Sequence, residues 1–103
     1  MELNGKKILV VGMGKSGLAA TYALYDLGVH LTLQDSKEMD KIDPELLKWI
    51  EGKDISCSFG HLPEDMTVFD IVVLSPGVSP ELPFVQKAKE SGAEWLQPLF
   101  TDF

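Results

Sequence analysis

The feature that most constrains this chain is an apolar run that stops at a glycine. Four consecutive apolar residues, from Ile8 to Val11, suit a strand buried on both faces of a parallel sheet. The pattern G-x-G-x-x-G follows at Gly12, Gly14 and Gly17, directly before a helical pattern. In a dinucleotide-binding turn these glycines permit the tight turn, the close approach of a pyrophosphate and the close packing of the helix. The spacing therefore predicts a helix whose N-terminus faces a nucleotide-type ligand.

The same stretch contains a second, misleading pattern. Gly14-Lys15-Ser16 matches the end of the ATP-binding P-loop, G-x-x-x-x-G-K-[ST]. That loop needs a glycine five positions before Gly14, where Leu9 stands in the middle of the expected strand. We therefore reject an ATPase loop here. Serine is a favoured N-cap residue, so we expect Ser16 to cap the following helix.

Apolar spacing predicts the remaining elements. Ala20, Ala23, Leu24 and Leu27 form a helical stripe that ends at Gly28. The other expected elements are strands over 29–34, 55–59, 70–74 and 93–96, helices over 43–51 and 80–91, and a short helical turn near 63. Asp43 is expected to cap its helix with Pro44 at the first helical position, and the strand over 55–59 is expected near an edge of the sheet. This order predicts an α/β fold, a Rossmann-like three-layer domain with a mostly parallel five-stranded sheet. We expect residues 1–103 to form this single domain.

A carboxylate follows the second expected strand. Asp35 stands eighteen positions after Gly17, close to the spacing at which a Rossmann fold holds a ribose hydroxyl. The alternative is a polar loop residue, because aspartate is common in the turns that follow strands. The glycines upstream favour the binding role for Asp35.

A second candidate turn follows the strand expected over 70–74. Its residues are Ser75, Pro76 and Gly77. Ligands of open α/β sheets bind beyond the carboxyl ends of the strands, where a compact turn offers backbone N–H groups. The sequence S-P-G is also a common chain breaker, so the residues alone leave a binding turn and a plain turn equally supported.

The charge balance narrows the class of partner. Nine Lys and Arg against 16 Asp and Glu give a net charge of −7, which opposes binding to nucleic acid or to an anionic membrane. No apolar run approaches the roughly 20 residues of a membrane span. The single cysteine, Cys57, suits a reducing cytoplasm, and its place in an alternating strand predicts a buried, inert thiol. His61 has no acid or cysteine partner in the pattern, so we expect a structural role and no metal site.

Three motifs together resemble one family. V-V-G-M-G-K-S-G, D-S-K after the second strand and V-L-S-P-G-V-S-P after the fourth resemble the N-terminal domain of the D-glutamate-adding Mur ligases of peptidoglycan synthesis. The resemblance implies a cytoplasmic, monomeric, three-domain enzyme. With ATP and Mg²⁺, such an enzyme joins D-glutamate to UDP-N-acetylmuramoyl-L-alanine through an acyl phosphate. It also implies that this chain is the substrate-binding part and is inactive alone, with the ATPase and C-terminal domains beyond Phe103. The apolar ending over 98–103 is expected of a chain that continues into another domain.

The resemblance also assigns binding residues. The diphosphate-and-uracil loop of the family corresponds to Gly14, Lys15, Ser16 and Gly17. The turn that brackets the uracil corresponds to Asp35, Ser36 and Lys37, and the S-P-G turn corresponds to Ser75, Pro76 and Gly77. The resemblance implies no catalytic residue, metal ligand or bound cofactor within this chain.

Two other classes of protein share part of this pattern. A regulatory Rossmann domain that senses NAD(H) or another nucleotide would account for the glycines and for Asp35, but it gives no reason for the S-P-G turn. The coenzyme half of a dehydrogenase would account for the same residues, but no acid–base pair for hydride transfer is visible in the chain.

Overall fold

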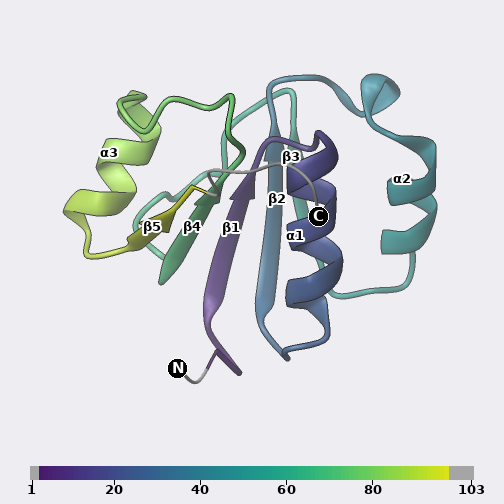
Figure 1. Cartoon of the computed structure of the whole chain (residues 1–103), viewed down its shortest axis with the longest axis horizontal. Helices are drawn as coiled ribbons and strands as arrows, with labels where there is room; N and C mark the ends of the chain where they lie inside the picture. Colours follow the sequence, from purple (N-terminus) through teal and green to yellow (C-terminus); the bar gives the residue numbers. More distant parts are fainter. Residues whose placement is uncertain (1–2, 98–103) are drawn as a thin grey trace.

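The computed structural model describes residues 3–97, and it contains one five-stranded sheet flanked by helices (Figure 1). The elements in chain order are β1 (Lys7–Val11), α1 (Lys15–Tyr25), β2 (His30–Asp35), the 3-10 helix η1 (Met39–Lys41), α2 (Pro44–Ile50), β3 (Ser56–Phe59), β4 (Ile71–Leu74), α3 (Pro83–Glu90) and β5 (Glu94–Leu96). The strand order is β3-β2-β1-β4-β5, and every described pairing is parallel. The predicted α/β fold is confirmed. The apolar ending over 98–103, which is expected to lead into another domain, lies outside the described residues.

Strand β1 is at the centre of the sheet and separates two apolar cores. Ile8 and Val10 face one core, which also contains side chains of α1 and α2, whereas Leu9 and Val11 face a second core on the side of α3. Side chains alternate between the two faces of a strand, so four consecutive apolar residues supply both cores. Helices therefore cover both faces of the sheet, which confirms the predicted three layers.

Helix α1 differs from its prediction in two ways. Gly14 is its N-cap and Ser16 lies in its first turn, so the predicted cap at Ser16 is wrong. Ser16, Gly17 and Thr21 are the fully buried residues of the helix. Of the predicted stripe, Ala20 and Leu24 pack against the core, whereas Ala23 and Leu27 are exposed. A Cβ atom at Gly17 would lie 1.7 Å from the carbonyl oxygen of Gly12, so the first turn of the helix lies too close to the glycine loop for any side chain at this position. Thr21 is buried one turn later, where its hydroxyl donates to the Gly17 carbonyl at 2.8 Å.

The other two α-helices begin at prolines, but only α2 begins where the sequence predicts. Asp43 caps α2 by accepting from the N–H of Glu45 at 2.9 Å, as the sequence predicts. Helix α3 begins at Pro83 and not at 80, because the hydroxyl of Ser79 accepts from the N–H of Glu81 and holds a turn there.

The helical turn expected near 63 is absent from the described residues. Asp65 accepts hydrogen bonds from both the N–H, at 2.8 Å, and the hydroxyl of Thr67. This local turn competes with helix formation. Buried Met66 and Phe69 nevertheless attach the segment to the core beneath α3.

Cys57 lies in the edge strand β3, as predicted, but its side chain is only half-buried. Within residues 3–97, no helix is long and apolar enough to cross a membrane.

Candidate ligand-binding site

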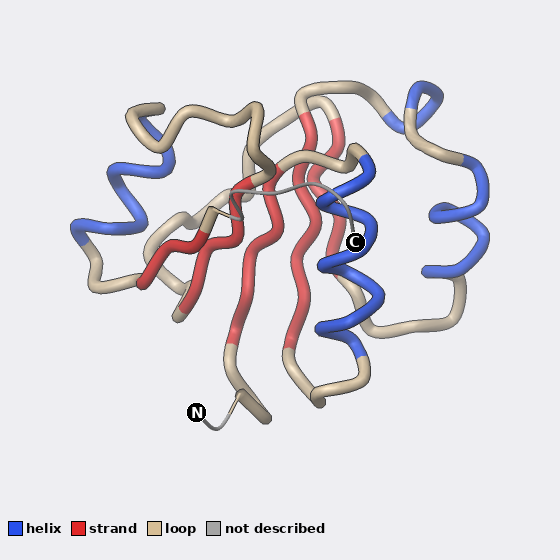
Figure 2. The backbone as a smooth tube through the Cα atoms, in the orientation of Figure 1, coloured by secondary structure: helices blue, strands red, loops and turns tan. Residues whose placement is uncertain are grey.

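Three loops leave the same edge of the sheet, at the carboxyl ends of β2, β1 and β4 (Figure 2). The register aligns Val11 with Gln34 on one side and with Leu74 on the other, so the three strands end at one level. The strand order reverses between β1 and β4, which is the position where open α/β sheets bind ligands. The structure therefore brings the three predicted motifs together.

Asp35 links two of these loops. Its Oδ2 accepts a hydrogen bond from the N–H of Met13 at 2.7 Å, and its Oδ1 accepts one from the N–H of Lys37 at 2.9 Å. The carboxylate therefore holds the glycine loop against the end of β2. Both of its oxygens are engaged within the protein, which makes Asp35 an organising residue of the site.

Ser75 links the third loop to the first. Its hydroxyl donates to the carbonyl of Gly12 at 2.9 Å, and its N–H donates to the carbonyl of Val11 at 3.0 Å. Gly12 has a φ of +93°, and a Cβ atom there would lie 2.7 Å from the Ser75 hydroxyl oxygen. Glycine is therefore required at this turn both by backbone conformation and by the close approach of Ser75.

The N-terminus of α1 is open toward the centre of this edge. Within the described chain, no carbonyl accepts from the N–H groups of Lys15, Ser16 and Gly17, and the first turn contains no acidic residue. A Cβ atom at Gly14 would have nothing within 4 Å, so the space in front of the turn is free. Unpaired N–H groups and the positive end of the helix dipole favour an anion at this position.

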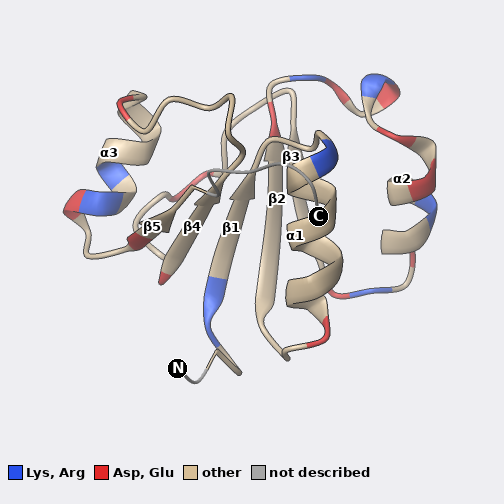
Figure 3. Ribbon diagram, viewed as in Figure 1, with Lys and Arg blue, Asp and Glu red and all other residues tan. Residues whose placement is uncertain are grey.

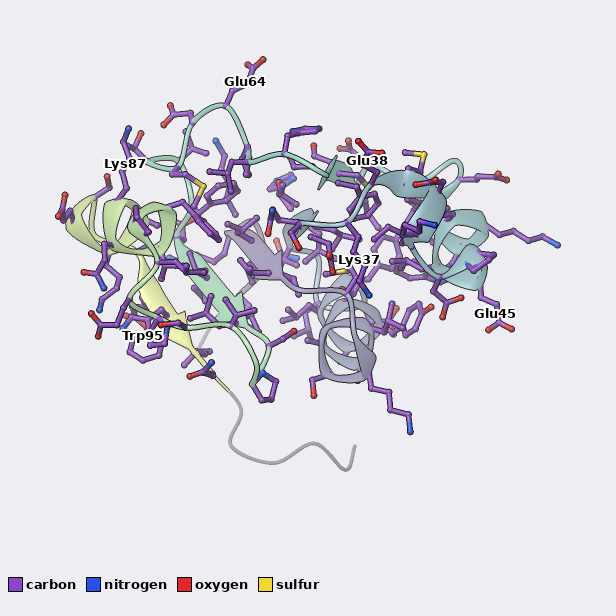
Figure 4. All side chains as sticks on the ribbon, turned by 90° about the horizontal axis from the view of Figure 1, so that it is seen from above. Lys37, Glu38, Glu45, Glu64, Lys87 and Trp95 are labelled. Carbon is purple, nitrogen blue, oxygen red and sulfur yellow. The ribbon has the colours of Figure 1, made fainter. Side chains whose placement is uncertain are left out.

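Two lysines add positive charge to an otherwise acidic molecule here. Lys15 begins α1 and Lys37 follows β2, and both are exposed (Figure 3). Viewed from above, Lys37 projects over α1, whereas Glu45 points away on α2 (Figure 4). The positive charges thus lie beside the open helix terminus, where they favour an anionic ligand.

A hollow of about 320 Å³ opens beside the glycine loop. Its walls are formed by Val11, Gly12, Gln34, Asp35, Ser36, Leu62, Val78, Leu82 and Phe84. Of the predicted site residues, only Asp35 and Ser36 line it, while the other eight lie outside its lining. A larger hollow of about 540 Å³ lies over β2 and β3 and contains none of the predicted residues. The edge with the free N–H groups is the better candidate, because the loops there converge on unpaired donors.

The sequence pattern of the family described as "Mur ligase MurD-like, N-terminal domain" matches residues 6–97. This chain belongs to that family. The match covers the glycine loop, the turn after β2 and the turn after β4, and it confirms the resemblance that these motifs suggest.

Several ligases are similar to this Mur ligase domain. The UDP-N-acetylmuramoylalanine–D-glutamate ligase of Clostridioides difficile (strain 630) is 41% identical over 92 residues, which cover 89% of this chain and 20% of the relative. The ligase of the same name from Desulfitobacterium hafniense (strain DSM 10664 / DCB-2) is 45% identical over 95 residues, which cover 90% of this chain and 20% of the relative. The chain spans about a fifth of the length of these relatives.

Solved structures of other enzymes share the fold of this Mur ligase domain. The precorrin-2 dehydrogenase SirC has a TM-score of 0.68 at 17% identity, covering 100% of this chain and 48% of the other. Shikimate dehydrogenase from Aquifex aeolicus has a TM-score of 0.59 at 23% identity, covering 95% and 44%. At these identities the similarity concerns the Rossmann-like fold alone.

The structure adds two residues to the site of the Mur ligase domain that sequence patterns missed. Gln97, after β5, donates from its side-chain amide to the carbonyls of Ser75 and Val78. Gln34, near the end of β2, donates from its amide to the carbonyl of His61 at 3.2 Å. The sequence could have indicated these two residues only as glutamines near the ends of strands, and that pattern is too common to predict a role in a site.

Proposed function

We propose that this chain holds the UDP end of UDP-N-acetylmuramoyl-L-alanine in a D-glutamate-adding Mur ligase. The observation that supports this most directly is the open N-terminus of α1, where the N–H groups of Lys15, Ser16 and Gly17 have no acceptor within the described chain. A diphosphate carries the negative charge and the acceptor oxygens that such a terminus favours. The similarity to ligases named for that substrate supports the choice of ligand.

The diphosphate is proposed to lie against Gly14, Lys15, Ser16 and Gly17. The absence of a side chain at Gly14 leaves room for the phosphate oxygens, and the exposed ammonium group of Lys15 adds charge. The hydroxyl of Ser16 lies in the same turn and can donate to a phosphate oxygen.

The uracil is proposed to lie beside the turn Asp35-Ser36-Lys37. Asp35 holds this turn against the glycine loop, so it orients the turn's backbone groups toward the base. The exposed stem of Lys37 can cover one face of the ring. Ser75 fixes the opposite wall through Gly12, and exposed Pro76 and Gly77 complete it.

The reaction of the full-length enzyme is proposed from the resemblance. Transfer of a phosphoryl group from ATP to the alanyl carboxylate would give an acyl phosphate and ADP. Attack by the amine of D-glutamate on the acyl phosphate would then form the amide and release phosphate. ATP and Mg²⁺ would be held by the rest of the enzyme. Residues 3–97 contain no group of three or more His, Cys, Asp or Glu side chains that could hold a metal ion, and the glycine loop lacks the P-loop spacing. The 103-residue domain is therefore proposed to bind substrate without catalysing the reaction, as part of a monomeric cytoplasmic enzyme.

A nucleotide titration tests this proposal. UDP should shift the amide NMR signals of residues 14–17, 35–37 and 75–77 in the 103-residue chain, because these segments surround the proposed site. NAD is the comparison ligand, since a nucleotide-sensing Rossmann domain would bind it through the same loops. Shifts caused by NAD and not by UDP would overturn the proposal.

A further inference from the structure

We infer that Gln97 is a positioning residue that holds the turn after β4 in the orientation needed for the nucleotide. This inference rests on the proposed function and extends it to a residue outside the binding motifs. Gln97 follows β5 and is half-buried, and it lies 22 residues from Ser75 along the chain.

The side-chain amide of Gln97 uses both of its donors on one turn. Its Nε2 atom is 3.0 Å from the carbonyl oxygen of Ser75 and 2.5 Å from that of Val78, while the Pro76 oxygen is 3.5 Å away. The N–H of Val78 also donates to the Ser75 carbonyl at 2.9 Å and closes the turn. One side chain therefore clamps both ends of the segment that contains Pro76 and Gly77.

The clamped turn is connected directly to the glycine loop. The hydroxyl of Ser75 donates to the carbonyl of Gly12, and the next N–H, that of Met13, donates to Asp35. Gln97 thus secures one end of a hydrogen-bonded chain, and Asp35 secures the other. A displacement of the turn after β4 would also move the glycine loop, because Ser75 is hydrogen-bonded to Gly12.

Ser75 and Val78 anchor the two ends of the turn to the glycine loop and to the core, whereas Gln97 is the side chain that joins these two ends to each other. Pro76 and Gly77 are exposed, and a Cβ atom at Gly77 would have nothing within 4 Å. Without Gln97, water can solvate the carbonyls of Ser75 and Val78, so the fold loses little while the turn gains freedom. Ligand binding must then order the turn again, which weakens the affinity.

The test compares glutamine variants of the 103-residue chain by UDP affinity and by amide hydrogen exchange. Gln97→Met keeps the length and removes the donors, and Gln97→Glu keeps the shape but turns carboxylate oxygens toward two carbonyls. Gln86→Met is the matched control, because Gln86 is also half-buried and its amide donates to the carbonyl of Pro80 at 2.8 Å, on the turn before α3.

We expect Gln97→Met to weaken UDP binding about tenfold, because ligand binding must then order the turn again. Gln97→Glu should weaken it at least as much, and Gln86→Met should leave it unchanged. The N–H of Val78 should exchange faster in both Gln97 variants even without ligand, while the thermal midpoint moves little.

The outcomes separate the two proposals. Absence of UDP binding by the unmodified chain would overturn the proposed function, and the exchange of the Val78 N–H would still test the clamp. UDP binding and Val78 exchange that are unchanged by Gln97→Met would overturn the inference. Global unfolding of both Gln97 variants would also overturn it, because Gln97 would then support the whole fold and not this turn.

Discussion

The Oδ2 atom of Asp35 lies 2.7 Å from the backbone nitrogen of Met13, so a side chain at the end of β2 holds the loop that follows β1. The same carboxylate accepts from the N–H of Lys37 at 2.9 Å. Two segments of the proposed nucleotide site therefore share one acceptor, and their relative placement depends on it.

Asp35→Asn should uncouple these segments. Asparagine presents one acceptor oxygen and one NH₂ group, so one of the two N–H groups loses its partner. We expect about 1–3 kcal/mol lower free energy of unfolding and about tenfold weaker UDP binding, measured by denaturation and by NMR titration. Asp43→Asn is the control, because Asp43 caps α2 and Asn caps helices equally well. Equal UDP affinities for Asp35→Asn and the unmodified chain would contradict the organising role.

Two glycine substitutions should affect different properties: Gly17→Ala should lower the stability of the fold, and Gly14→Ala should lower the affinity for UDP. In Gly17→Ala the new Cβ atom would lie 1.7 Å from a backbone oxygen, which forces α1 away from the sheet. We expect a loss of roughly 2–4 kcal/mol in the free energy of unfolding, comparable to severe overpacking. In Gly14→Ala the new methyl group points into free space, so stability should remain within about 0.5 kcal/mol. UDP binding should nevertheless weaken, because the methyl group occupies the space proposed for the diphosphate. UDP affinity that is unchanged in Gly14→Ala would contradict the proposed position of the diphosphate against this glycine.

Ser16→Ala tests the proposed hydrogen bond to phosphate. Ser16 is 7% exposed in the first turn of α1, and Ser58, which is equally buried in β3, is the control. Ser16→Ala should reduce UDP affinity by about tenfold to a hundredfold, because a hydrogen bond to a charged group contributes about 1.5–3 kcal/mol. Ser58→Ala should leave the affinity unchanged. Calorimetric titration of both variants measures the difference. A matching loss in Ser58→Ala would point to a general effect on the fold.

The reactivity of Cys57 should follow its burial. Burial raises the pKa of the Cys57 thiol above its ordinary value of 9.0, because the thiolate is poorly solvated. Alkylation at pH 8 should therefore be slower in the folded chain than in denaturant, since less thiolate is present. The folded state binds this proton more tightly than the unfolded state, so its contribution to stability is present below pH 9 and is lost as the pH rises through the folded pKa. In Cys57→Ser, the free energy of unfolding should therefore decrease less as the pH rises above 9, as measured by denaturation at several pH values.

Local signals predicted most of the fold. The apolar run of β1 and the glycines that follow it specify a strand, a turn and a closely packed helix, and the contact between Gly17 and the Gly12 carbonyl explains why. Asp43 and the following proline predicted the start of α2 correctly. These signals act within a few residues, where backbone conformation and side-chain size decide the outcome.

Errors occurred where a more distant contact or a competing turn decided the structure. The apolar stripe of α1 was only half right: Ala20 and Leu24 pack against the core, but Ala23 and Leu27 are exposed. The fully buried positions are Ser16, Gly17 and Thr21, because the first turns of the helix lie close to the glycine loop. The expected helical turn near 63 was replaced by the turn of Asp65 and Thr67. The role of Gln97 could not be predicted, because its partners are about twenty residues away and become neighbours only through the pairing of β4 and β5.

The sequence by itself determined the order of the elements and the positions where only glycine fits, because both depend on local conformation and on the alternation of apolar residues. It also carried the motifs that identify the family. The tertiary structure decided what Asp35, Ser75 and Gln97 bind. Their partners lie on other strands, and the strand order β2-β1-β4-β5 brings those backbone groups within reach. Hydrogen bonds act over about 3 Å, so a site built from them exists only after distant segments have been placed side by side.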